Sequence, residues 1–116
     1  IVLSRFFDHV FSIDVEYDEE RVAIAREAGV TNVTRVVVEN NAEKYRYIAG
    51  LKFDAAFVDG DHARDTETDF AAVRHCGQVL FHEYWGAQPA VKNLVDRLAA
   101  GPGRVAIRGK FARWIA

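Results

Sequence analysis

Short apolar segments alternate along the chain with segments in which apolar residues recur at helical spacing. Clusters of β-branched and aromatic residues predict four buried strands, at 10–14, 34–38, 53–58 and 78–81. Capping residues and helical periodicity predict helices between and after them, at 18–28, 42–48, 65–76 and 89–98. The run at 34–38 is almost continuously apolar, as expected of a strand covered on both faces.

The order of these elements predicts how the strands pair. Strands that alternate with helices form a mostly parallel sheet with helices on both faces, because the crossovers are right-handed. Segments 105–107 and 111–115 flank Gly109–Lys110 and predict a terminal hairpin. The fold class is therefore α/β, with a doubly wound, mostly parallel sheet and a C-terminal antiparallel hairpin.

Composition narrows the classes of protein that remain. The 116 residues are half apolar, which predicts one domain over 1–116 and excludes a multidomain enzyme. Acidic and basic residues are interleaved and the net charge is −2, so we expect no nucleic-acid partner. No apolar run approaches the roughly 20 residues of a membrane span, so we expect no membrane partner. The single cysteine, Cys76, excludes an intrachain disulfide and favours a reducing, cytoplasmic location.

Polar side chains follow the predicted strands at the edge where ligands bind to such sheets. Asp14 can accept hydrogen bonds from both hydroxyls of a ribose, or it can cap the next helix. Asn40 and Asn41 can offer amide groups to an adenine edge, or they can occupy a turn. Each position alone fits an ordinary turn residue, whereas a row of them indicates a binding edge.

The next two strand ends carry groups suited to proton and metal chemistry. Asp59-Gly60-Asp61-His62 follows one strand and His82-Glu83-Tyr84 follows the other. Two carboxylates on neighbouring strand ends can converge on a divalent cation such as Mg²⁺. A nearby imidazole can take a proton from a hydroxyl. The alternative is structural: His62 and Asp61 cap a helix while His82 packs under Trp85.

Four motifs together resemble class I S-adenosylmethionine-dependent methyltransferases, and specifically the small-molecule and sugar O-methyltransferases. The motifs are Phe11-Ser12-Ile13-Asp14, the segment from Phe53 to His62, Asp69-Phe70, and Val79-Leu80-Phe81-His82-Glu83-Tyr84. The resemblance implies a Rossmann-like fold of seven strands, the last two forming the terminal hairpin. It also implies a first strand and a glycine-rich loop, and nothing before Val10 matches them. We therefore expect a truncated domain with a gap in its sheet.

The resemblance implies a role for each matching residue. Asp14 would bind the cofactor ribose, and Asn40 and Asn41 the adenine. Asp59 would lie beside the cofactor and, with Glu83, hold the metal, although relatives often have Asp where this chain has Glu83. His62 would be the general base. The function implied is methyl transfer to a hydroxyl of a small molecule or sugar.

Two other classes of function remain open. A non-catalytic Rossmann-like module that has lost the cofactor loop would act through binding or dimerisation, and a bare strand edge would favour a homo-oligomer. A nucleotide-dependent oxidoreductase would also use an acid after its second strand. Hydride transfer would need neither Asp59-Gly60-Asp61-His62 nor His82-Glu83-Tyr84. An oxidoreductase is therefore the function that we expect least.

Overall fold

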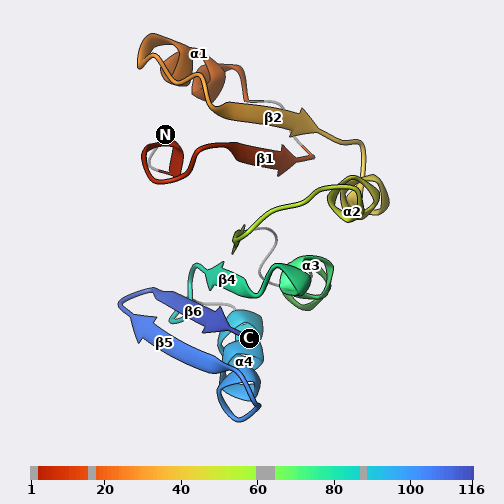
Figure 1. Cartoon of the computed structure of the whole chain (residues 1–116), viewed down its shortest axis with the longest axis vertical. Coiled ribbons are helices and arrows are strands. Elements are labelled where there is room, and N and C mark those ends of the chain that lie inside the picture. The colour runs from red at the N-terminus through yellow and green to blue at the C-terminus, as the bar shows by residue number, and fades with distance from the viewer. Residues whose placement is uncertain (1–2, 16–17, 60–64, 87–88) are drawn as a thin grey trace. The chain divides into compact units, whose positions relative to one another are not determined.

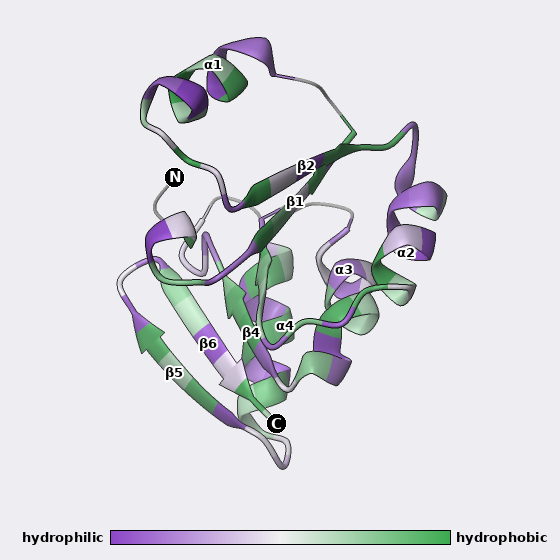
Figure 2. Ribbon diagram, turned by 45° about the horizontal axis from the view of Figure 1, so that its top comes forward, coloured by the Kyte–Doolittle hydropathy of each residue, from purple (hydrophilic) through white to green (hydrophobic). Residues whose placement is uncertain are grey.

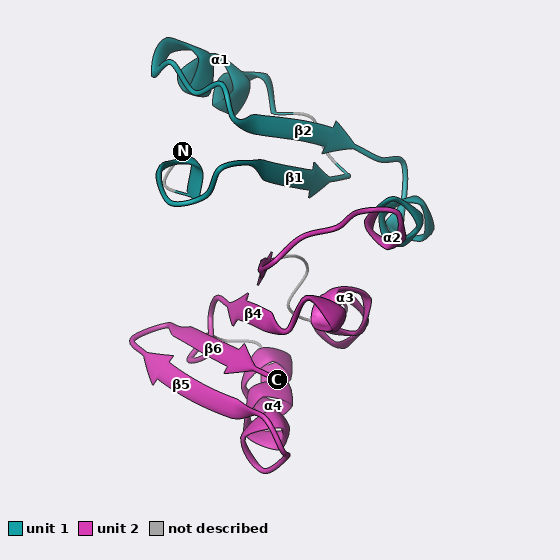
Figure 3. Ribbon diagram, viewed as in Figure 1, with its two compact units in different colours: residues 1–47 teal, residues 48–116 magenta. Residues whose placement is uncertain are grey.

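The computed structural model describes residues 3–15, 18–59, 65–86 and 89–116. The chain divides into two units, 1–47 and 48–116, which are coloured teal and magenta in Figure 3. Each unit contains parallel strands joined through helices, so the α/β class predicted from the sequence is confirmed. Among the described residues, no helix has both the length and the apolar character needed to cross a bilayer.

Unit 1 is built on one parallel strand pair (Figure 1). A short 3-10 helix, η1 (Leu3–Arg5), precedes β1 (Val10–Asp14), which pairs in parallel with β2 (Val33–Val37). Between them lies α1 (Glu19–Glu27), and α2 (Asn41–Ala49) follows β2 and continues into unit 2. The predicted cap of α1 is confirmed, because the Asp18 carboxylate accepts a hydrogen bond from the amide of Arg21.

Unit 2 contains a four-stranded sheet with the order β3-β4-β6-β5. Its strands are β3 (Ala56–Val58), β4 (Gln78–Phe81), β5 (Arg104–Arg108) and β6 (Phe111–Ile115). The first two are parallel, and β6 pairs antiparallel with both β4 and β5. The predicted hairpin is therefore confirmed. Its two-residue turn places Gly109 at φ 59°, a left-handed conformation that glycine adopts without steric cost.

Helices cover one face of this sheet. They are α3 (Thr66–Val73), extended by the 3-10 turn η2 (Arg74–Cys76), and α4 (Pro89–Ala99). The Phe70 ring on α3 contacts Phe81 on β4 and Trp114 on β6, with ring centroids 5.7 and 5.0 Å apart. The predicted apolar stripe of α4 is buried through Val91, Leu94 and Val95. Figure 2 shows that α4 carries both hydrophobic and hydrophilic residues. These residues form the core of unit 2.

The strands of unit 1 are less covered than the sequence predicts. The run 34–38 was expected to be covered on both faces, yet Thr34, Arg35 and Val37 are exposed. Phe11 on β1 is exposed as well, and β3 is shorter than the predicted 53–58 segment. The reason is pairing: within the described residues β1 pairs only with β2, and two strands bury little surface. A continuous doubly wound sheet therefore stays a prediction, as does a single domain over 1–116.

Candidate functional site

The strand ends of unit 2 bring three of the predicted polar residues together. Because β3 and β4 are parallel and Val58 lies opposite Phe81, both strands end at the same edge. Asp59 follows β3 at this edge, and His82 and Glu83 follow β4. The Asp59 carboxylate oxygen Oδ1 lies 3.2 Å from His82 Nδ1. The parallel pairing of β3 and β4 thus brings an acid and an imidazole together at this edge.

The imidazole of His82 is bracketed by two carboxylates. Its second nitrogen, Nε2, lies 3.3 Å from Oε1 of Glu83. A neutral imidazole has one N–H, so it can donate to only one of the carboxylates; the protonated ring can donate to both. Both carboxylates therefore lie within hydrogen-bonding reach of the ring and help to fix its orientation.

Aromatic side chains flank the same imidazole. The Phe57 and Phe111 ring centroids lie 6.3 and 5.1 Å from that of His82. These contacts come from β3 and β6, so three strands hold the ring. His82 packs with these rings instead of under Trp85, the structural alternative raised by the sequence. Phe57 and Phe111 went unrecognised in the sequence because their closeness depends on strand order.

Glu83 is held in an unusual backbone conformation. Its φ is 63°, the only positive φ of a non-glycine residue in the described part of the chain. The amide of Gly86 donates to the Glu83 carbonyl at 2.9 Å, which closes a turn after β4. Left-handed backbone at a non-glycine residue costs energy and is typical of functional sites. The turn keeps the Glu83 carboxylate beside His82.

Gly86→Ala is expected to destabilise this turn by about 1–3 kcal/mol. A Cβ at Gly86 would lie 3.0 Å from the Glu83 carbonyl oxygen and 2.9 Å from its Oε2, so backbone or carboxylate must move. Urea unfolding measures the change. Gly101→Ala is the matched control, because its nearest neighbour would lie at 3.4 Å. Equal effects from the two substitutions would contradict the assigned role of Gly86.

A second polar group ties the turn after β4 to α4. The Tyr84 hydroxyl donates to Oδ1 of Asp96, and Lys92 Nζ donates to Oδ2, each at 2.6 Å. These bonds lower the pKa of Asp96 below its usual 3.8, with the Lys92 bond contributing most. The bond to Asp96 likewise raises the pKa of Tyr84 above 10.0 and that of Lys92 above 10.5. The backbone of Tyr84 also donates to the Lys110 carbonyl at 2.9 Å.

This network is expected to contribute stability over a defined pH range. The lowered pKa of Asp96 means that its contribution is present above pH 3.8 and is lost as the pH falls below that value. The raised pKa values of Tyr84 and Lys92 mean that the contribution of Tyr84 is present up to pH 10.0 and that of Lys92 up to pH 10.5, and that each is lost as the pH rises further. In Asp96→Asn we expect Tyr84 to ionise at lower pH than in the unaltered chain. Tyrosinate absorbance, with Tyr84→Phe subtracted, measures this shift, and an unchanged titration would contradict the network.

Trp85 follows in the same turn and is 64% exposed. Its ring meets the Tyr84 ring edge-on at 4.8 Å, and the Lys92 ammonium lies 5.6 Å from its centroid. An exposed indole held in place on one side offers its open surface for stacking. Trp85 therefore offers the exposed aromatic surface of this turn, whereas Tyr84 is buried.

The predicted cofactor residues lie in unit 1. Asp14 ends β1, and its Oδ1 accepts from the amide of Val15 at 2.7 Å. The Asn40 side chain accepts from the amide of Glu43 at 2.9 Å, which caps α2, and Asn41 is the first residue of that helix. Asp14 is the last residue of β1 and Asn40 follows β2, so both lie at the carboxyl ends of the paired strands. Asn40 therefore has a structural role in the turn before α2, which was the alternative to adenine binding.

The remaining predictions concern His62 and the metal. His62, with Asp61, lies outside the described residues. Asp59 and Glu83 contact different nitrogens of His82 and do not surround a common point. Within the described ranges, no group of three His, Cys, Asp or Glu side chains could hold a metal ion. In this arrangement the two acids contact a shared imidazole, and the metal role expected for Asp59 and Glu83 stays a prediction.

Comparison of the chain with protein-family models, with curated proteins and with solved structures found no significant match. The functional interpretation therefore rests on the residues and their geometry.

Proposed function

We propose that the protein transfers a methyl group from S-adenosylmethionine to a hydroxyl oxygen of a small molecule or sugar. The observation that supports this proposal is the cluster of Asp59, His82 and Glu83 where β3 and β4 end. Ligands of parallel α/β sheets bind at this edge, and an acid–imidazole pair there is suited to removing a proton from a bound hydroxyl.

The cofactor supplies an activated methyl group, and what the protein must do is position the acceptor and remove its proton. Asp59 holds Nδ1 of His82, which leaves Nε2 to take the proton when Glu83 yields its place to the acceptor hydroxyl. The acceptor oxygen then forms a bond to the methyl carbon as the carbon–sulfur bond breaks. His62 is the second candidate for the base, on the sequence resemblance.

The proposal is tested first by cofactor binding. Isothermal titration of the whole chain with S-adenosylmethionine is expected to show saturable binding. Asp14→Asn should weaken it about tenfold or more, because a charged acceptor for the ribose is lost while the side chain can still accept from Val15. Asp54→Asn, at another exposed acid, should leave binding unchanged. No saturable binding by the unaltered chain would overturn the proposed function.

A non-catalytic binding or dimerisation module is the second candidate, and it is favoured by unit 1. Large apolar side chains are exposed on this unit: Phe6, Phe7, Phe11, Val15, Ile24 and Val37. Exposed apolar groups beside a strand with one paired edge favour association with another chain. Sedimentation velocity tests this candidate: a stable dimer that binds no S-adenosylmethionine would support it over methyl transfer.

A further inference from the structure

The C-terminal part of the chain concentrates positive charge that the net charge of −2 conceals. From position 97 to the end there is no Asp or Glu, and five residues are cationic: Arg97, Arg104, Arg108, Lys110 and Arg113. Strand alternation places Arg104 and Arg108 on one face of β5. Arg113 on β6 lies on the same face, since its register partner is Ala106. Three guanidinium groups thus share one face of the hairpin.

This face is opposite the one that the helices cover. Trp114 and Phe81, which contact Phe70 of α3, alternate along their strands with the residues of the basic face. Arg104, Arg108 and Arg113 are all exposed. None of the three forms an ion pair with a carboxylate among the described residues. In the part of unit 2 that the structure describes, no carboxylate therefore neutralises their charge.

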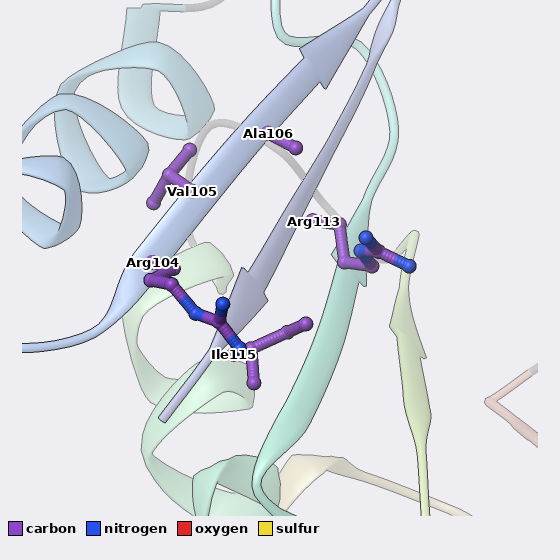
Figure 4. Close-up of a pocket in the computed structure, with 5 residues that line it drawn as sticks. All are labelled: Arg104, Val105, Ala106, Arg113 and Ile115. Carbon is purple, nitrogen blue, oxygen red and sulfur yellow. The ribbon is translucent and has the colours of Figure 1, made fainter.

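A cavity of about 280 Å³ lies between two of these arginines. It is lined by Arg104, Val105, Ala106, Arg113 and Ile115 (Figure 4). Arg104 and Arg113 come from the two different strands of the hairpin, so the cavity combines two cationic groups with an apolar floor. Guanidinium groups bind phosphate oxygens through paired hydrogen bonds, which makes this cavity suited to a phosphate group.

Exposed rings continue the same face. Phe111 is opposite Arg108 in the hairpin and is 43% exposed. Phe57 is 36% exposed, with its ring centroid 6.4 Å from that of Phe111. The face therefore presents arginines on β5 and β6, and aromatic rings on β6 and β3. Arginines that track phosphates beside aromatic rings that stack on bases are the combination used to bind single strands.

We propose that this basic face of β5 and β6, together with Phe57 and Phe111, binds single-stranded nucleic acid. Arg104, Arg108 and Arg113 contact successive phosphates, and unpaired bases stack on the two rings. This inference does not depend on methyl transfer. The net charge of −2 led us to expect no nucleic-acid partner. The proposal differs from that expectation because a negative net charge can coexist with a positively charged face.

The test is fluorescence anisotropy with the whole chain and labelled oligouridylate of about 15 nucleotides. We expect saturable binding at about 50 mM salt and a loss of about 20-fold in affinity at about 200 mM, as three phosphate contacts predict. Arg104→Glu/Arg113→Glu should abolish the binding. Phe111→Ala should weaken it about fivefold or more, and a duplex of the same length should bind at least fivefold more weakly.

The matched control is Arg35→Glu/Arg46→Glu, which changes the net charge equally at two exposed arginines of unit 1. It should retain most of the affinity, and circular dichroism confirms that each variant is folded. Equal loss in the two double variants, equal binding of the duplex, or no saturable binding at low salt would each overturn the proposal. Because the readout is oligonucleotide binding, a failure here leaves the S-adenosylmethionine titration unaffected.

Discussion

Phe81→Ala is expected to lower the free energy of unfolding by about 3–5 kcal/mol. Phe81 is fully buried in the centre of unit 2, at 0% exposure, and its ring contacts Phe70. It also lies opposite Val58 and Ala112 in the sheet, so strands on both sides limit how far the structure can collapse. The substitution therefore leaves a cavity as well as removing buried apolar surface. Small domains are stable by only about 5–15 kcal/mol, so the loss is large.

Urea unfolding followed by far-ultraviolet circular dichroism measures this effect. Ile107→Ala is the control on the same sheet, because Ile107 is exposed on the edge strand β5. It should cost less than about 1 kcal/mol. Similar losses for Phe81→Ala and Ile107→Ala would contradict the placement of the core between the sheet and α3.

His82→Gln is expected to lower the rate of methyl transfer about 100-fold to 10,000-fold while S-adenosylmethionine still binds. The imidazole is the described group that joins Asp59 to Glu83, and glutamine keeps hydrogen-bonding capacity without a titratable nitrogen. The measurement is release of S-adenosylhomocysteine with a panel of phenols and monosaccharides as acceptors.

Two further variants separate a catalytic imidazole from a structural one. If Asp59 acts by positioning His82, Asp59→Asn combined with His82→Gln should cost no more than His82→Gln alone. His62→Gln tests the competing base implied by the sequence resemblance. A large loss in His62→Gln with an unaffected His82→Gln would assign the proton to His62 and leave His82 a structural role.

Much of the local structure follows from the sequence. The strands at 10–14 and 78–81 match their predicted limits, and Pro89 begins α4 as expected. The capped start of α1 at Asp18 is also where the sequence predicts it, and positive φ values at Gly29 and Gly77, 73° and 84°, follow α1 and η2. These features depend on backbone sterics and on capping bonds between near neighbours, so a few adjacent residues decide them.

The site was predictable only in part. The sequence placed Asp59, His82 and Glu83 after two predicted parallel strands. Because parallel strands end at one edge of a sheet, these residues could be expected to be neighbours. The sequence assigned the two acids to a metal and the proton to His62, whereas the structure aligns both acids on the nitrogens of His82. The positive φ of Glu83 and the tight approach of Gly86 decide that geometry, and neither follows from residue type alone.

The amino-acid sequence by itself determined the α/β class, the helix limits and the polar character of the strand ends, since periodicity and capping are local properties. Tertiary structure alone decided that β6 lies between β4 and β5, and hence which side chains meet. Strand pairing brings Phe111 next to His82, which is far from it in the sequence. It also places Arg113 opposite Ala106, across the hairpin turn. Such contacts depend on which strands and helices pack together. The packing is decided by the burial of apolar surface over the whole sheet.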